Sequence, residues 1–361
     1  MTGVGSTKPP AASPGLLDAA QDDAAVQRDM MALLRLRNVA LVSSEADAPA
    51  ALARLGVVAA AQFPSAGALM TVRRDANGRE VYWVYNPTPQ AITTTGSFAA
   101  YGQPTQLNLW TGSQTPVADY TAERDGRTDV PVTLAPYATT AFAFSGPEQV
   151  HVVATNAQEA SYGPNGNILL ADSRGGTHTA TLSNGQHVTL NLGQVPAPLD
   201  VTKWSLNVNE LTPTGTTSQN LNLDGLSDWR TIPGLQTAAG QAMYTAQVNV
   251  PASWLQANRD VLIDVGDVEG AMQLRVNGSL VTPQTTSDVE MPITNLLHAG
   301  TNTITVRLDT TLLNEMVALD QSGNPAYSTG PTPLTSAPSG LLGPVTLTPQ
   351  AVASVSLARR W

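Results

Sequence analysis

The sequence contains no cysteine, which excludes disulfide bonds and thiolate metal sites. Charged residues are scarce, at 13% of the 361 positions, and their balance is acidic, with a formal net charge of −10. Binding to nucleic acid requires clustered lysine and arginine side chains that neutralise phosphates. The composition therefore argues against a nucleic-acid partner.

Long apolar runs are also absent from the sequence. No segment approaches the roughly 18 to 20 consecutive apolar residues that a bilayer-spanning helix requires, so we expect no membrane partner. The N-terminus lacks a basic segment followed by an apolar stretch, and we therefore expect no secretory signal in this chain.

Turn-forming residues are abundant, with 29 glycines and 26 prolines, and hydrophobic residues make up 42% of the chain. A length of 361 residues is enough for two or three domains with a sizeable core. Threonine and valine are plentiful in the second half, which favours strands over helices. We predict a mainly β protein, with small antiparallel β modules followed by a β-sandwich and one or two short N-terminal helices.

The stretch 228–347 has the clearest strand pattern. Apolar residues occupy every second position from Tyr244 to Val250, which is typical of a strand with one buried face. The same alternation recurs over 261–265, 272–276 and 304–308. Asn277-Gly278 predicts a hairpin turn, and Gly300-Thr301-Asn302 predicts another turn before a strand. Short strands separated by such turns indicate an antiparallel sandwich or jelly roll.

This order of motifs resembles the galactose-binding-like jelly roll found in many glycoside hydrolases. The motifs that carry the resemblance are the Trp229 entry, the Tyr244 strand, Val276-Asn277-Gly278, Ile293-Thr294, Gly300-Thr301-Asn302 and the final strand Ser339 to Leu347. The ending Ser-Gly-Leu-Leu-Gly-Pro-Val is most similar to the C-terminal module of α-L-rhamnosidase-type hydrolases of family 106. The resemblance covers about a third of the chain.

The first half also resembles part of such an enzyme. Leu55-Gly56-Val57 is similar to the last helix of a catalytic (β/α)₈ barrel, and Arg73-Arg74 with 82–86 is similar to the start of the β module that follows it. Leu109-Trp110-Thr111-Gly112, Asp125-Gly126-Arg127-Thr128 and Leu134-Ala135-Pro136 resemble that module. The polar run 212–222 is interpreted as a loop.

These patterns give a predicted domain order. We expect a disordered N-terminus at 1–15, a helical remnant of a barrel at 16–66, a small β-sandwich at 67–148, a β extension and linker at 149–225, a galactose-binding-like jelly roll at 226–349 and a tail at 350–361.

The best carboxylate candidates are Asp264, Asp267 and Glu269, of which the last two share strand parity. A solvated acidic loop is the ordinary interpretation. A structural calcium site is the next, because carboxylates and carbonyls at loop edges suit that ion, and a catalytic pair is the least favoured. The resemblance implies catalytic glutamates and a calcium in a barrel, but no position here matches those motifs. We therefore assign no catalytic residue and no required cofactor.

Carbohydrate contact is expected to depend on aromatic and polar side chains. Trp254 follows Pro251-Ala252-Ser253 in a loop and is the tryptophan most expected to be exposed, while Trp229 is a second candidate. Arg275 and Asn277 point away from the apolar face of their strand and are expected to form a polar rim. Core packing is the competing interpretation for each tryptophan. None of the four histidines has metal-ligand spacing; His298 is interpreted as an exposed turn residue, and His178 and His187 as separate surface positions.

The sequence therefore leaves three functions open. The chain is a non-catalytic C-terminal portion of an α-L-rhamnosidase-like glycoside hydrolase, a free-standing carbohydrate-binding module, or a β spacer without a ligand. The expected partners are a rhamnose-containing glycan or a catalytic barrel domain. Such a barrel usually takes about 250 residues, and we find no segments of this sequence that match it. An extracellular or periplasmic location is expected if the chain is part of a secreted enzyme.

Overall fold

The computed structural model describes Leu17 and residues 19–282, 290–323, 325–327, 334–355 and 357. The described chain is mainly antiparallel β structure and divides into two compact units between Gln62 and Phe63. The mainly β prediction, with short N-terminal helices, is confirmed. Each unit is described by itself.

The first unit contains the helical elements that the sequence predicts. These are α1 (Ala19–Leu33), the 3₁₀ turn η1 (Glu45–Asp47), α2 (Ala48–Arg54) and the short β1 (Ala61–Gln62). Gly56 follows α2 with a φ of +74°, which glycine adopts without the steric cost that other residues incur. Among the described residues of this unit, only Ala51 is buried.

The second unit begins with a small β-sandwich. Its strands are β2 (Met70–Ala76), β3 (Arg79–Tyr85), β4 (Ile92–Phe98), β5 (Gln103–Leu107), β6 (Gln114–Pro116), β7 (Thr121–Ala122), β8 (Thr128–Leu134) and β9 (Thr139–Ser145). One sheet has the order β2-β3-β9-β5-β6, and β8 pairs with both β4 and β7. Tyr82 and Phe144 contact Phe98 with ring centroids 5.0 and 5.4 Å away, so aromatic packing fills this core.

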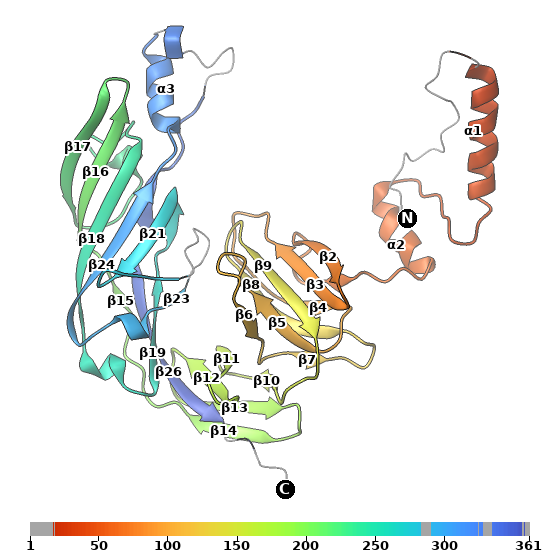
Figure 1. Ribbon diagram of the computed structural model, residues 1–361, viewed down its shortest axis with the longest axis horizontal. Coiled ribbons are helices and arrows are strands. Elements are labelled where there is room, and N and C mark those ends of the chain that lie inside the picture. Colours follow the sequence, from red (N-terminus) through yellow and green to blue (C-terminus); the bar gives the residue numbers. More distant parts are fainter. Residues whose placement is uncertain are drawn as a thin grey trace. The chain divides into compact units, whose positions relative to one another are not determined.

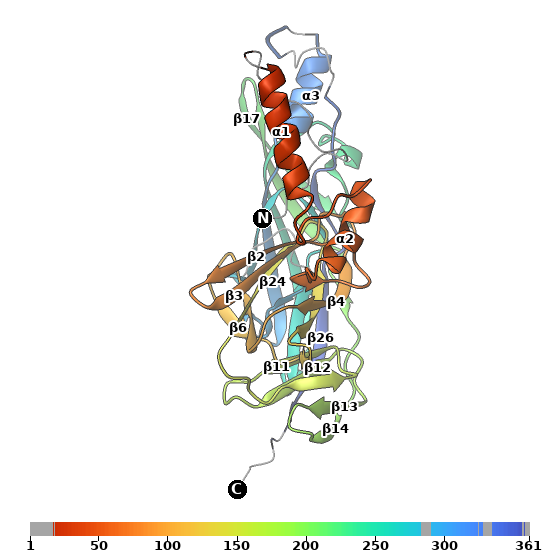
Figure 2. The same cartoon turned by 90° about the vertical axis from the view of Figure 1, so that its right-hand side faces the viewer.

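The next segment supplies strands to two different sheets (Figure 1). β10 (Val152–Thr155), β13 (Thr177–Leu182) and β14 (His187–Asn191) form a sheet of their own. β11 (Glu159–Tyr162) and β12 (Ile168–Asp172) join the sheet that we call sheet I, in the order β11-β12-β26-β19-β23. Sheet I also contains β26 (Thr346–Val355), β19 (Arg259–Asp264), β23 (Met291–Pro292) and, beside β26, β15 (Leu199–Asp200). β12 and β26 lie side by side in both views (Figures 1 and 2).

A second six-stranded sheet, sheet II, packs against sheet I. Its order is β17-β16-β18-β24-β21-β22, with bounds β16 (Trp204–Thr212), β17 (Gly215–Leu223), β18 (Gly240–Val250), β21 (Ala271–Val276), β22 (Ser279–Leu280) and β24 (Gly300–Asp309). One apolar core joins the two sheets, with Tyr244 and Val306 from sheet II and Ile263 and Leu347 from sheet I. The alternation predicted for 244–250, 261–265 and 304–308 is confirmed by this burial.

Smaller elements complete the second unit. They are η2 (Trp229–Thr231), η3 (Ala252–Leu255), β20 (Asp267–Glu269), η4 (Thr294–Leu296), α3 (Leu313–Gln321), η5 (Pro325–Tyr327) and β25 (Gly340–Gly343). β20 follows β19 in the chain and pairs with β25, so this segment is hydrogen-bonded to the C-terminal part of the chain.

The interpretation of 212–222 as a loop was wrong. These residues turn at Thr212–Gly215 and continue as β17, which pairs with β16 over nine residue pairs from Trp204–Leu223 to Thr212–Gly215. β17 is an edge strand whose first four residues are exposed and polar, and its apolar alternation is confined to Leu221 and Leu223 at the end of the strand. Its threonines have a high strand propensity, which is the feature that favours the observed structure.

Candidate functional site

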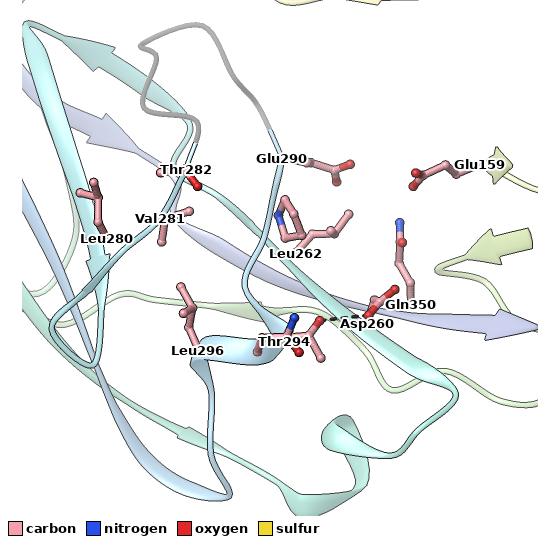
Figure 3. Close-up of a pocket in the computed structure, with 12 residues that line it drawn as sticks. Glu159, Asp260, Leu262, Leu280, Val281, Thr282, Glu290, Thr294, Leu296 and Gln350 are labelled. Atoms are coloured by element: carbon pink, nitrogen blue, oxygen red, sulfur yellow. Dashed lines mark hydrogen bonds between the residues drawn. The ribbon is translucent and has the colours of Figure 1, made fainter. Parts of the chain in front are cut away.

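A pocket of about 480 Å³ lies on the outer face of sheet I (Figure 3). Three of its lining residues are acidic: Glu159, Asp260 and Glu290. The others are the apolar Leu262, Leu280, Val281, Pro292 and Leu296 and the polar Thr282, Thr294, Asn295 and Gln350. The pocket thus combines acidic groups with an apolar wall, and we take it as the candidate functional site.

Strand register explains why residues from distant segments meet here. Asp260 lies opposite Gln350, and Ala171 lies opposite both Glu159 and Val352. Opposite residues in an antiparallel pair project to the same face, and residues two apart along a strand share a face. Glu159, Asp260 and Gln350 therefore share the outer face of sheet I.

The second wall is fixed by hydrogen bonds from η4. The Thr294 hydroxyl accepts a hydrogen bond from the Val261 amide at 2.8 Å and donates one to the Asp260 carboxylate at 3.2 Å. These bonds hold η4 against β19, which places Leu296 and Thr294 on the pocket (Figure 3).

Two asparagines hold the loop behind this wall. Asn302 is fully buried, donates to the carbonyls of His298 and Gly300 and accepts from the His298 amide at 3.0 Å. Asn277 donates to Asn302 Oδ1 and to the Leu296 carbonyl, both at 2.8 Å. The predicted hairpin turn at Asn277 is confirmed, and its side chain stabilises the loop that carries Leu296.

The acidic side chains of the pocket repel one another. Desolvation by the surrounding chain raises the pKa of Glu159, and the charges of Asp260 and Glu290 raise it further. Desolvation also raises the pKa of Glu290, with the charge of Asp264 as a second cause. Two of the three acids therefore hold their protons more tightly than an isolated glutamate does.

The Gln350 amide is the polar group at the floor of the pocket. Its residue is only 6% exposed, and its side chain extends between Glu159 and Glu290 in Figure 3. Within the described residues, this amide makes no hydrogen bond to the protein. The residue is largely buried but its amide end still reaches the pocket, so this amide can bind whatever fills the pocket.

The acidic residues predicted as a metal site lie on β19 and β20. Asp267 and Glu269 share one face of β20, as their parity predicts. Desolvation raises the pKa of both Asp264 and Glu269, and the charge of Asp267 raises it further. The Asp264 carboxylate accepts a hydrogen bond from the Gly266 amide at 2.7 Å. Over the described part of the chain, no three acidic or histidine side chains are grouped so that they could hold a metal ion. A structural calcium site at Asp264, Asp267 and Glu269 stays a prediction.

Trp229, predicted as a carbohydrate contact, is fully buried. Its indole donates to the Tyr244 hydroxyl at 2.5 Å, and that hydroxyl accepts from the Leu341 amide at 3.2 Å. Asp228 accepts from the amides of Arg230 and Ser339 at the same junction. Trp229 thus fixes the final strands to sheet II and presents no ring to solvent.

The exposure expected for Trp254 was wrong. This residue lies in η3 and is 5% exposed. The 3₁₀ turn after Pro251 directs the indole into the shared core of sheets I and II, where it packs. The position of Trp254 in a short turn after Pro251 therefore does not indicate that its side chain is exposed.

Arg275 and Asn277 do point away from the buried residues Leu274 and Val276, as predicted. The Arg275 guanidinium donates to Gln273 and, at 2.9 Å, to the Gly278 carbonyl. Arg275 is therefore used within the hairpin and Asn277 in holding the loop that carries Leu296, and their contact with carbohydrate stays a prediction.

His178 was predicted at the surface, and this prediction was wrong. His178 is 4% exposed, and its Nε2 lies 2.9 Å from the Gly175 carbonyl oxygen. Asp172, which is fully buried, accepts two hydrogen bonds from the Arg174 guanidinium and lies 3.7 Å from His178 Nδ1. His151 is also buried and stacks on Tyr120, so these side chains serve packing.

Trp110 is an exposed tryptophan that the sequence interpretation did not choose as a carbohydrate contact. It is 74% exposed in the turn between β5 and β6. Asn108 Oδ1 accepts from the backbone amides of Trp110 and Thr111, both at 3.0 Å, and thereby fixes the turn. Such a turn is indicated in the sequence by Asn108, two residues before Trp110, together with Gly112.

Comparison with known proteins gives a fold relationship. The structure matches the rhamnosidase from Novosphingobium sp. PP1Y over 95% of this chain with 22% sequence identity and a TM-score of 0.58, and spans 30% of that protein. A weaker match is the β-D-glucuronidase of Dictyoglomus thermophilum, with 17% identity over 43% of this chain and 28% of that chain and a TM-score of 0.31. Another is the β-glucuronidase of Faecalibacterium prausnitzii, with 18% identity over 45% of this chain and 33% of that chain and a TM-score of 0.31. No family model and no curated protein matches the sequence.

Among the described residues, no helix is long and apolar enough to cross a membrane.

Proposed function

We propose that this chain is a non-catalytic β region of a rhamnosidase-like glycoside hydrolase and that residues 17–62 bind the enzyme's catalytic barrel. The fold of nearly the whole chain is similar to less than a third of the Novosphingobium rhamnosidase. This coverage supports the role of an accessory region rather than that of a complete enzyme.

The observation that carries the proposal is the missing core of the first unit. Its described part buries only Ala51, while it exposes seven large apolar side chains: Leu17, Met31, Leu33, Leu36, Leu41, Val57 and Val58. α1 has 15 residues and no buried side chain, and a helix of that length is marginal in water without tertiary packing. A barrel surface that covers these side chains supplies the missing packing.

A capture experiment in the source organism tests this proposal. The tagged chain is expected to recover aryl-α-L-rhamnoside hydrolysis together with a polypeptide that contains a (β/α)₈ barrel. Leu36→Asp with Val58→Asp is expected to lose both, whereas Glu159→Gln retains them. Hydrolysis by the purified chain alone, or no hydrolase recovered with it, would overturn the proposal.

A second candidate function is carbohydrate contact, and the favouring observation is Trp110. Its ring is 74% exposed on a turn that Asn108 fixes, which suits stacking on the C–H face of a sugar. Titration with rhamnose-containing oligosaccharides is expected to quench tryptophan fluorescence in the native chain and not in Trp110→Ala. Equal quenching in both would reject this role.

A further inference from the structure

We infer that the pocket on sheet I binds an organic ammonium ion with an apolar body, such as an alkyl diamine. This inference does not rest on the proposed function, because all the lining residues belong to the second unit and none belongs to residues 17–62.

The charge of the lining points to a cation. Glu159, Asp260 and Glu290 contribute three carboxyl groups, and among the described lining residues there is no lysine or arginine. The side chains of Glu159 and Glu290 point toward each other across the pocket (Figure 3). A positive charge between them would offset the repulsion that raises the pKa of Glu159.

The Gln350 amide supplies an independent observation. It is more than nine-tenths buried, extends into the pocket between the two glutamates and has no protein partner among the described residues. Its carbonyl oxygen can accept an N–H from an ammonium group, which carries three donors and no acceptor. The amide thus provides a neutral acceptor beside the charged ones.

The apolar residues decide what kind of cation fits. Leu262, Leu280 and Leu296 line the same volume of about 480 Å³, which exceeds what an ion requires. The described residues also contain no group of side chains arranged to hold a metal ion. No aromatic ring is present in the lining, so the usual stacking surface for a neutral sugar is missing. An alkyl chain with ammonium ends matches both the acids and the leucines.

Calorimetric titration of the full chain with 1,6-diaminohexane and with 1,6-hexanediol, its neutral isostere, tests the inference. The diamine is expected to bind and the diol is not. Glu159→Gln with Glu290→Gln should weaken diamine binding by about tenfold or more, since both charges that face the bound ammonium group are lost. Gln350→Leu should weaken it by a smaller factor.

The matched control is Glu45→Gln with Glu123→Gln, which removes the same charge from exposed positions outside the pocket. It should bind the diamine as the native chain does. Equal weakening in the control would show attraction to the net charge alone and would overturn the inference. Binding of the diol or of L-rhamnose at least as tight as the diamine, or no diamine binding at all, would also overturn it. Circular dichroism melts establish that each variant is folded.

Discussion

Gly340 shows how a residue that carries the family resemblance can be structural. Its φ is +107°, and a Cβ at this position would lie 2.4 Å from Trp229 Cδ1 and 3.1 Å from the Tyr244 hydroxyl. Only glycine therefore allows β25 to pass the Trp229 indole. Packing against Trp229 therefore explains why position 340 requires glycine.

Gly340→Ala is expected to lower the free energy of unfolding by about 2 to 4 kcal/mol, because strain at a positive φ adds to overpacking against Trp229. Urea unfolding followed by tryptophan fluorescence measures the change. Gly278→Ala is the control, since its φ is +81° but no atom lies within 4 Å of the added Cβ. A loss at Gly340 no larger than at Gly278 would contradict the packing account.

Asn302→Ala is expected to cost about 2 to 3 kcal/mol, because the substitution leaves the His298 and Gly300 carbonyls and the His298 amide without their partner. Asn249→Ala, on the exposed face of β18, should change stability by less than about 0.5 kcal/mol. Thermal melts compare the two variants. Similar small effects would show that the amide network does not hold the loop.

At the scale of elements, the pocket depends on β11, β19, β26 and η4 meeting on one face of sheet I. The acids that this arrangement brings together oppose folding when they are ionised. The pKa of Glu159 is raised in the folded state. The stability that its protonated form contributes is therefore fully present below the pKa of the unfolded chain, about 4.3, and is lost as the pH rises through the pKa of the folded state.

Glu159→Gln is therefore expected to stabilise the protein relative to the native chain at pH 7 and to have little effect near pH 3.5. The gain should stay below about 1 kcal/mol, because the side chain contacts solvent. Thermal melts at the two pH values measure it, with Glu123→Gln as the control. A gain at pH 3.5 equal to that at pH 7 would contradict the electrostatic explanation.

The predictability of the elements differs for physical reasons. Alternation predicted β18, β19 and β24 because one face of each is buried and the other is not. β17 was missed because the first four residues of this edge strand are exposed and polar, and its apolar alternation is confined to Leu221 and Leu223. Trp254 was misplaced because a 3₁₀ turn can direct one indole into a core from an otherwise polar loop.

The pocket could not be predicted from the sequence, for a different reason. The alternation of 260–265 does place Asp260 on the face opposite Val261 and Ile263. Nothing local indicates that Glu159, a hundred residues earlier, lies on the same sheet face. That neighbourhood is set by the pairing of β11 with β12 and of β12 with β26, which joins segments far apart in the chain.

At the scale of the whole molecule, the two units differ in how they are stabilised. The second unit has continuous cores, such as the one shared by sheets I and II, and its fold is that of part of a rhamnosidase. The first unit, over its described residues, has helices without a core. The account's central claim is that a catalytic barrel provides the packing that these helices lack.

Hydrogen exchange of the isolated chain, followed by mass spectrometry of peptides, tests that claim most directly. The account predicts that amides of α1 and α2 exchange close to unfolded rates, while those of β18 and β24 are strongly protected, and that the captured hydrolase slows exchange in α1 and α2. Strong protection of 19–54 in the isolated chain would contradict the claim, because those helices would then be stable without a barrel.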